Sequence, residues 1–135
     1  MRRLIESKRP PLPDISISAV QGMFLHMLAQ SAPSKTLIEV GALGGYSAAW
    51  LASALRAGAP GHLFSIERDP ARAAFARQNL ADAGLGSLVT VLNEPALEAL
   101  PSLCRRMQRH GVGLVFLDAK KSEYAKAPSS AFFLL

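Results

Sequence analysis

A glycine-rich turn between an apolar strand and an alanine-rich helix constrains this chain more than any other feature. The segment reads Leu37-Ile-Glu-Val-Gly-Ala-Leu-Gly-Gly-Tyr-Ser47. Glycine has no Cβ, so the backbone can turn sharply there and approach a ligand closely. The helix that follows offers unpaired N–H groups and the positive end of its dipole. The turn therefore predicts a binding site for a ligand that carries a carboxylate or a phosphate.

An acidic residue at the end of a second predicted strand indicates the kind of ligand. The segment Phe64-Ser-Ile-Glu67 follows the turn after about one strand-and-helix unit. In doubly wound folds, an acid at this place accepts hydrogen bonds from ribose hydroxyls. Turn and acid together predict a cofactor that contains an adenosine group.

Strands alternate with helices along most of the chain. We expect strands over 36–41, 62–67, 88–92 and 112–117, and helices over 18–33, 46–57, 69–84 and 95–109. This alternation predicts an α/β fold: an incomplete, Rossmann-like, doubly wound parallel sheet of about four strands in the order 3-2-1-4. Because the strands are continuously apolar, helices should cover both faces of the sheet.

Signals at helix ends and apolar spacing refine this prediction. Ser18-Ala-Val-Gln21 has the form of a capping box, and Asp69-Pro70 supplies a cap with a first-turn proline. Gly84 should end the helix that Asp69 begins. In the first helix, apolar residues recur at helical spacing, so we expect Met23 and Met27 to belong to the core.

The two ends of the chain differ in character from its middle. Residues 1–14 are basic and proline-rich, and we expect them to form a flexible arm ahead of a cofactor-binding domain over 15–124. Residues 125–135 begin polar and end in Phe-Phe-Leu-Leu135, which makes an atypical tail. A contiguous apolar end predicts a lost partner surface or a misread reading frame.

Composition excludes several classes of function. The net charge is +5, but the basic residues are scattered and no aromatic residues alternate with them, which argues against nucleic-acid binding. Cys104 is the only cysteine, so no internal disulfide forms and a reducing cytoplasm fits. No apolar run approaches the roughly 18 residues of a membrane span. We therefore expect a cytoplasmic protein that does not bind membranes.

The spacing of the glycines resembles one cofactor family in particular. A dinucleotide-binding site would have the pattern G-x-G-x-x-G, which the turn Gly41-Ala-Leu-Gly44-Gly45 does not match. Glu39 stands two residues before the first glycine. The resulting form, E-x-G-x-x-x-G-Y-S, resembles the cofactor motif of class I S-adenosylmethionine-dependent methyltransferases. Over about 15–124 the chain resembles the cation-dependent O-methyltransferases, the group of catechol and caffeoyl-CoA O-methyltransferases. The matching segments are 17–22, 37–50, 66–70, 76–80, 83–85 and 115–124.

The resemblance implies a role for each matching cofactor-site residue. By this comparison Glu39 lies beneath the loop near the cofactor's amino group, Ser47 helps hold its carboxylate, and Glu67 accepts both ribose hydroxyls. Arg68 would lie beside the adenine, and Gly45 would permit the tight turn. The remaining residues implied to contact the cofactor are Ile17, Gly41, Ala42, Leu43 and Asp118.

The resemblance also implies a catalytic apparatus for methyl transfer to a hydroxyl of a small, catechol-like acceptor. Asp118 matches a metal-ligand aspartate and Lys121 the lysine of a general base, with Tyr124 following. Oxygen ligands favour Mg²⁺, Mn²⁺ or Ca²⁺ as the cation. A lysine near that cation and the sulfonium would have a lowered pKa and could accept a proton. Lys121 is equally well explained as a solvated lysine.

Several alternatives stay open. The family continues with another strand that carries an Asp-Asn metal pair, which this sequence lacks, so we expect a C-terminal truncation. One carboxylate alone makes a poor Mg²⁺ site. The chain could therefore be an inactive remnant that binds the cofactor or a partner chain. A nicotinamide dinucleotide-binding oxidoreductase domain is disfavoured by the glycine spacing and by Glu39. Members of the family that it resembles are often homodimers, and the sequence leaves the oligomeric state open.

Overall fold

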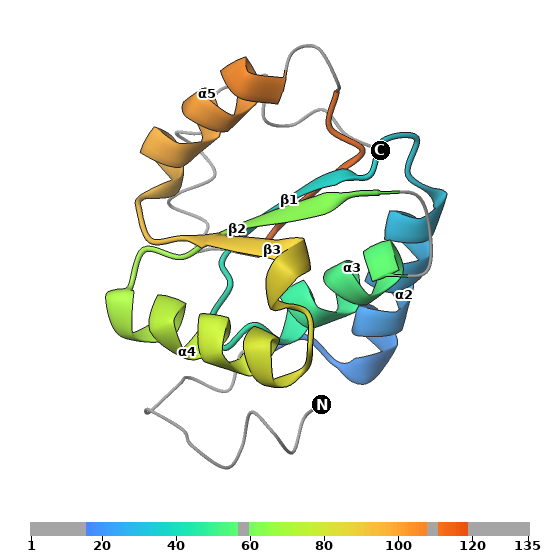
Figure 1. Ribbon diagram of the computed structural model, residues 1–135, viewed down its shortest axis with the longest axis horizontal. Helices are drawn as coiled ribbons and strands as arrows, with labels where there is room; N and C mark the ends of the chain where they lie inside the picture. Colours follow the sequence, from blue (N-terminus) through green and yellow to red (C-terminus); the bar gives the residue numbers. More distant parts are fainter. Residues whose placement is uncertain (1–15, 57–59, 108–110, 119–135) are drawn as a thin grey trace.

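Four parallel strands form the centre of the computed structural model, which describes residues 16–56, 60–107 and 111–118. Their order across the sheet is β3-β2-β1-β4, and helices lie on both sides of it (Figure 1). The elements are α2 (Ala19–Ser31), β1 (Thr36–Val40), α3 (Tyr46–Arg56), β2 (His62–Ile66), α4 (Pro70–Asp82), η1 (Gly86–Leu88), β3 (Val89–Leu92), α5 (Ala96–Met107) and β4 (Leu114–Leu117). The predicted fold class and strand order are confirmed.

The register brings the carboxyl ends of the strands to one edge of the sheet. Ile38 of β1 pairs with Phe64 of β2 on one side and with Val115 of β4 on the other, and all pairings are parallel. The chain moves outward from β1 through β2 to β3, and β4 then joins the opposite side of β1. Ligands of open parallel sheets bind outside the carboxyl ends of the strands where this direction reverses.

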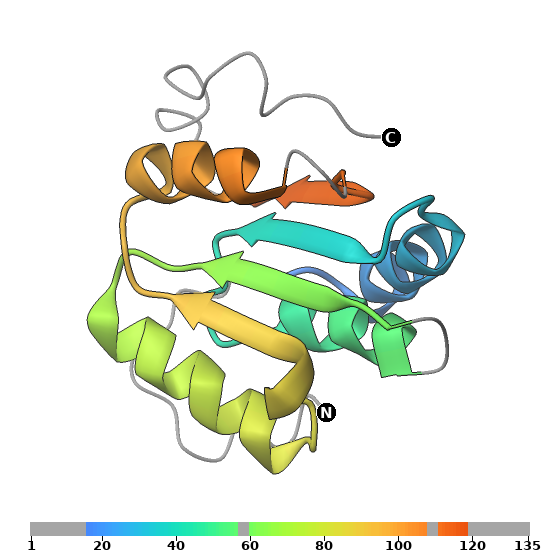
Figure 2. The ribbon, with the colours of Figure 1, turned by 45° about the horizontal axis from the view of Figure 1, so that its top comes forward.

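The two faces of the sheet carry separate apolar cores. Helices α2, α3 and α4 cover one face, and α5 covers the other (Figure 2). In β1 the alternate residues divide between the cores, with Leu37 on the three-helix side and Ile38 and Val40 on the α5 side. Since both faces are covered, the strands contain little polar surface, as their apolar sequences predict.

The predicted helix boundaries are confirmed where local capping signals exist. Ser18 and Gln21 complete the capping box at the start of α2. The Asp69 side chain caps α4, and Pro70 occupies its first turn. Gly84 follows α4 with a φ of 71°, the left-handed conformation that glycine adopts at helix ends.

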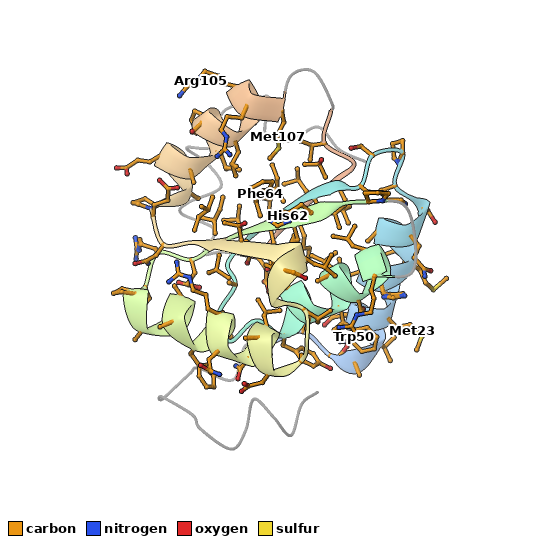
Figure 3. All side chains as sticks on the ribbon, viewed as in Figure 1. Met23, Trp50, His62, Phe64, Arg105 and Met107 are labelled. Atoms are coloured by element: carbon orange, nitrogen blue, oxygen red, sulfur yellow. The ribbon has the colours of Figure 1, made fainter. Side chains whose placement is uncertain are left out.

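The apolar face of α2 was predicted wrongly. Met23 and Met27 are not core residues: both are more than half exposed, together with Val20 and Phe24. The core side of the helix is instead formed by Gly22, Leu25 and Ala29. Figure 3 shows Met23 at the outer surface of this helix. The helix has apolar residues around most of its circumference, so spacing alone did not identify the buried side.

Close packing of α2 on α3 explains why a glycine lies on the buried side. A Cβ at Gly22 would overlap the indole ring of Trp50, a residue of α3. Trp50 also makes edge contacts with the rings of His26 and Tyr46. It therefore serves in packing between the two helices.

Some of the predicted features lie outside the described residues. These are the arm over 1–14, the tail over 125–135, Lys121 and Tyr124. Within the described part of the chain, no helix has the length and apolar character needed to cross a membrane.

Candidate functional site

The glycine turn after β1 is held at the carboxyl edge of the sheet by backbone hydrogen bonds. The amides of Gly41 and Ala42 both donate to the carbonyl of Ile66, at 2.9 and 3.3 Å. Gly41 and Gly45 have φ values of 97° and 85°, which favour glycine, and Leu43 shares this left-handed region at 51°. The turn is thus tied to the end of β2, directly beside the predicted ribose-binding acid.

Helix α4 supports the turn from behind. A Cβ added at Gly45 would lie 3.3 Å from the Cα and the carbonyl oxygen of Ala76. One turn further along α4, the side-chain amide of Asn79 donates a 2.8 Å hydrogen bond to the carbonyl of Gly44. The turn therefore has little room for any side chain at Gly45.

Glu67 connects the turn to the residues that follow β2. Its carboxylate accepts hydrogen bonds from the backbone amides of Leu43, at 2.9 Å, and of Asp69, at 3.0 Å. The side chain of Asn93 bonds to the carbonyls of Glu67 and Arg68 and so fixes this segment further. Each carboxylate oxygen keeps a second lone pair, so the carboxylate can still accept from two ligand hydroxyls.

Glu39 lies fully buried beneath the turn. Its two carboxylate oxygens accept hydrogen bonds from the hydroxyls of Ser47 and of Ser65. Burial raises the pKa of Glu39 to about 7, although the two serine hydrogen bonds lower it; the nearby charges of Asp118 and Glu67 raise it further. Near neutral pH the protonated and charged forms of Glu39 are therefore both populated, and a cation bound beside it would favour the charged form.

Asp118 follows β4 and lies next to the end of β1. Its backbone amide donates a 2.9 Å hydrogen bond to the carbonyl of Val40. The side chain is exposed, and partial desolvation raises its pKa. The structure thus brings Glu39, Glu67 and Asp118 to one edge, which makes this part of a basic protein acidic.

The residues that the structure describes do not form a metal site. Among them no group of three histidine, cysteine, aspartate or glutamate side chains is arranged to hold an ion. Divalent cations such as Mg²⁺ need several oxygen ligands. Asp118 alone therefore does not fit a bound cation.

The structure also places three other predicted cofactor-site residues: Ile17, Arg68 and Ser47. Ile17 is partly buried and packs on the core that faces α2, α3 and α4. Arg68 is exposed directly after Glu67. The hydroxyl of Ser47 is committed to Glu39, so its backbone amide at the start of α3 is the group left to meet a carboxylate.

Three polar residues at the site were not predicted from the sequence. Ser65, Asn79 and Asn93 bond to Glu39, Gly44 and the Glu67 segment, respectively. The signal available for Ser65 was a polar residue inside an otherwise apolar strand. Asn79 interrupts the buried side of α4 in the same way. Their partners lie far away in sequence, so a local pattern can mark these residues as unusual but cannot identify the groups that they bond to.

A parallel α/β sheet with a glycine turn after its first strand and carboxylates at the carboxyl ends of its strands is typical of domains that bind nucleoside-containing cofactors. Comparison with known proteins identifies the family: a family model described as O-methyltransferase matches residues 1–134. The chain belongs to this O-methyltransferase family.

Two curated relatives illustrate the similarity. The chain is 40% identical over 118 residues to a catechol O-methyltransferase of Niastella koreensis. The aligned segment covers 85% of this chain and 51% of the relative. It is 41% identical to a catechol O-methyltransferase of Mycobacterium tuberculosis, with 87% and 51% covered. The chain thus spans about half the length of these relatives.

Solved structures agree with the family and the fold. The O-methyltransferase TomG of Streptomyces achromogenes, in complex with SAM, is similar with a TM-score of 0.72 and 38% identity, covering 83% of this chain and 49% of that one. An O-methyltransferase of Bacillus cereus in complex with SAH has a TM-score of 0.71 and 31% identity, covering 86% and 53%.

Proposed function

We propose that this chain binds S-adenosylmethionine across the glycine turn and contributes the cofactor-binding part of an O-methyltransferase. The observation that carries the proposal is the contact between Glu67 and Leu43. The carboxylate accepts from the turn amide at 2.9 Å and is held in place beside the turn. This arrangement suits a ligand whose ribose hydroxyls bond to Glu67 while the rest of the molecule crosses the turn.

The acidic character of the site supports S-adenosylmethionine over a nicotinamide dinucleotide. Glu39, Glu67 and Asp118 lie near enough for the latter two to raise the pKa of the first. Carboxylates this close would repel a pyrophosphate, whereas they would attract a sulfonium and an ammonium group. Family membership and relatives bound to SAM or SAH support the same choice.

The methionine part of the cofactor would occupy the side of the turn near Glu39. Glu39 would attract the amino group, and the first amides of α3, including that of Ser47, would meet the carboxylate at the positive end of the helix. Gly41, Ala42 and Leu43 would line the chain between these two ends. Arg68 would lie at the adenine end.

Bound S-adenosylmethionine supplies a methyl group on a positively charged sulfur. The protein's task is to hold a hydroxyl oxygen in line with that methyl carbon, since positioning provides much of the rate. As the acceptor we propose a catechol-like hydroxyl, because the relatives named above are catechol O-methyltransferases. Lys121 would take the hydroxyl proton, and its role remains a prediction because it lies outside the described residues.

Cation assistance also remains a prediction. The family resemblance implies a divalent ion at Asp118, but the described residues offer no group of three ligands. We therefore assign no step of the reaction to a metal. Its test is methyl transfer to catechol with Mg²⁺ and with a chelator.

Titration calorimetry tests the cofactor assignment. We expect heat of binding with S-adenosylmethionine and S-adenosylhomocysteine and none with NAD. Binding of NAD alone would refute the proposal. Cofactor binding without methyl transfer to any catechol would instead identify the chain as a binding module without activity.

A further inference from the structure

Ser65 is a polar side chain in the apolar strand β2. It is fully buried, and its hydroxyl donates a 2.6 Å hydrogen bond to Oε2 of Glu39. The two residues are direct neighbours in the register of β1 and β2. A buried hydroxyl carries a desolvation cost that alanine would not, so the hydrogen bond to Glu39 is the evident reason for a serine here.

Two hydroxyls from different elements fix the orientation of the Glu39 carboxylate. Ser65 holds one oxygen from the neighbouring strand, and Ser47 holds the other from the first turn of α3. A carboxylate held at both oxygens cannot rotate freely about its terminal bond. Its remaining lone pairs therefore keep a constant direction relative to the glycine turn above it.

We propose that Ser65 is a positioning residue for cofactor binding and acts by orienting Glu39 toward the amino group of the cofactor's methionine part. The inference rests on the proposed function. Hydrogen bonds between charged groups depend on direction, and a group oriented before binding loses less entropy when the ligand arrives. Ser65 would thereby contribute to affinity without touching the ligand.

Two ligands distinguish positioning from a general structural role. S-adenosylhomocysteine carries the amino acid part, whereas methylthioadenosine has the adenosine and sulfur but lacks that part. In the Ser65→Ala variant of the full chain, we expect the Kd of S-adenosylhomocysteine to rise about tenfold, the effect of losing one hydrogen bond to a charged group. The Kd of methylthioadenosine should stay the same. The ratio of these two Kd values is insensitive to partial unfolding, because both ligands need the folded site and unfolding would raise both values equally.

A matched control and a double variant complete the test. Thr90→Val removes a hydroxyl from the adjacent strand, where it bonds to His62, and should leave the ratio unchanged. In a Glu39→Gln background, Ser65→Ala should have no further effect on the ratio, because the interaction that it supports is already lost. Ser65→Cys, with a weaker donor, should give an intermediate ratio.

The outcomes separate this inference from the proposed function. If Ser65→Ala leaves the ratio of the two Kd values unchanged, either because neither affinity falls or because both fall equally, the positioning role is overturned. Cofactor binding by the unaltered chain would be unaffected by that result. Failure of the unaltered chain to bind either ligand would instead overturn the proposed function, and the positioning role with it.

Discussion

The side-chain amide of Asn79 donates a hydrogen bond to the carbonyl of Gly44, and this bond joins helix α4 to a turn 35 residues earlier in the chain. Asn79 is buried, and the same helix packs Ala76 against Gly45. The shape of the glycine turn therefore depends on where α4 lies, as well as on the glycines themselves.

Replacement of Asn79 by alanine should weaken both the fold and cofactor binding. The buried carbonyl of Gly44 would lose its side-chain donor, so we expect the free energy of unfolding to fall by about 1–3 kcal/mol. Urea denaturation measures this change, and calorimetry should show weaker binding of S-adenosylhomocysteine. Gln78→Ala on the exposed side of α4 is the control and should change stability by no more than about 0.5 kcal/mol. Equal effects of the two substitutions would contradict the role of Asn79 in holding the glycine turn.

A methyl group at Gly45 should disrupt the turn. Gly45→Ala imposes a left-handed conformation on alanine and brings its Cβ within 3.3 Å of the α4 backbone. We expect a loss of stability of about 1–3 kcal/mol, because both the conformation and the contact are unfavourable. Gly86→Ala is the matched control, since a Cβ there meets Ala81 at an ordinary 3.5 Å. Thermal unfolding of both variants provides the measurement, and a stable Gly45→Ala protein would refute the packing argument.

Glu67→Gln should weaken the binding of every ligand that carries a ribose. The glutamine offers one oxygen where the carboxylate offers two, yet the amides of Leu43 and Asp69 and the ribose hydroxyls all need acceptors. We expect about a tenfold or greater loss of affinity for S-adenosylhomocysteine and methylthioadenosine alike, as for hydrogen bonds to a charged group. Glu94→Gln, a change at a residue beyond β3, serves as the control. A loss confined to S-adenosylhomocysteine would contradict the ribose assignment.

Stability should depend on pH through Glu39. Its pKa of about 7 in the folded protein lies above the ordinary value of 4.5, so the folded state keeps a proton that the unfolded chain has released. The contribution of this group to stability is therefore full below pH 4.5 and declines as the pH rises toward 7. The total decline is about 3 kcal/mol, from about 1.4 kcal/mol per pH unit.

Glu39→Gln isolates this contribution, because the amide does not titrate. Urea denaturation of both proteins between pH 5 and pH 8 should show the variant gaining stability relative to the unaltered chain as the pH rises. A difference that does not vary with pH would show that Glu39 has an ordinary pKa. The same variant should bind S-adenosylhomocysteine more weakly and methylthioadenosine unchanged.

Helix α2 shows how far spacing in a sequence can be trusted. Its start was predicted correctly because Ser18 and Gln21 bond within one turn. Its buried side was predicted wrongly because apolar residues occur around the helix, and the close approach at Gly22 to Trp50 selects the side that faces α3. Apolar residues such as Phe24 were therefore left at the surface.

The sequence by itself determined the alternation of strands and helices, the capped helix ends and the position of the glycine turn. Capping residues, glycine spacing and apolar strands act within a few residues, so they can be recognised without knowing the rest of the molecule. Only the tertiary structure decided that Glu39 is buried between Ser47 and Ser65 and that Asn79 holds Gly44. These contacts join residues on different elements, and their existence depends on how strands and helices pack, a property that no local pattern contains.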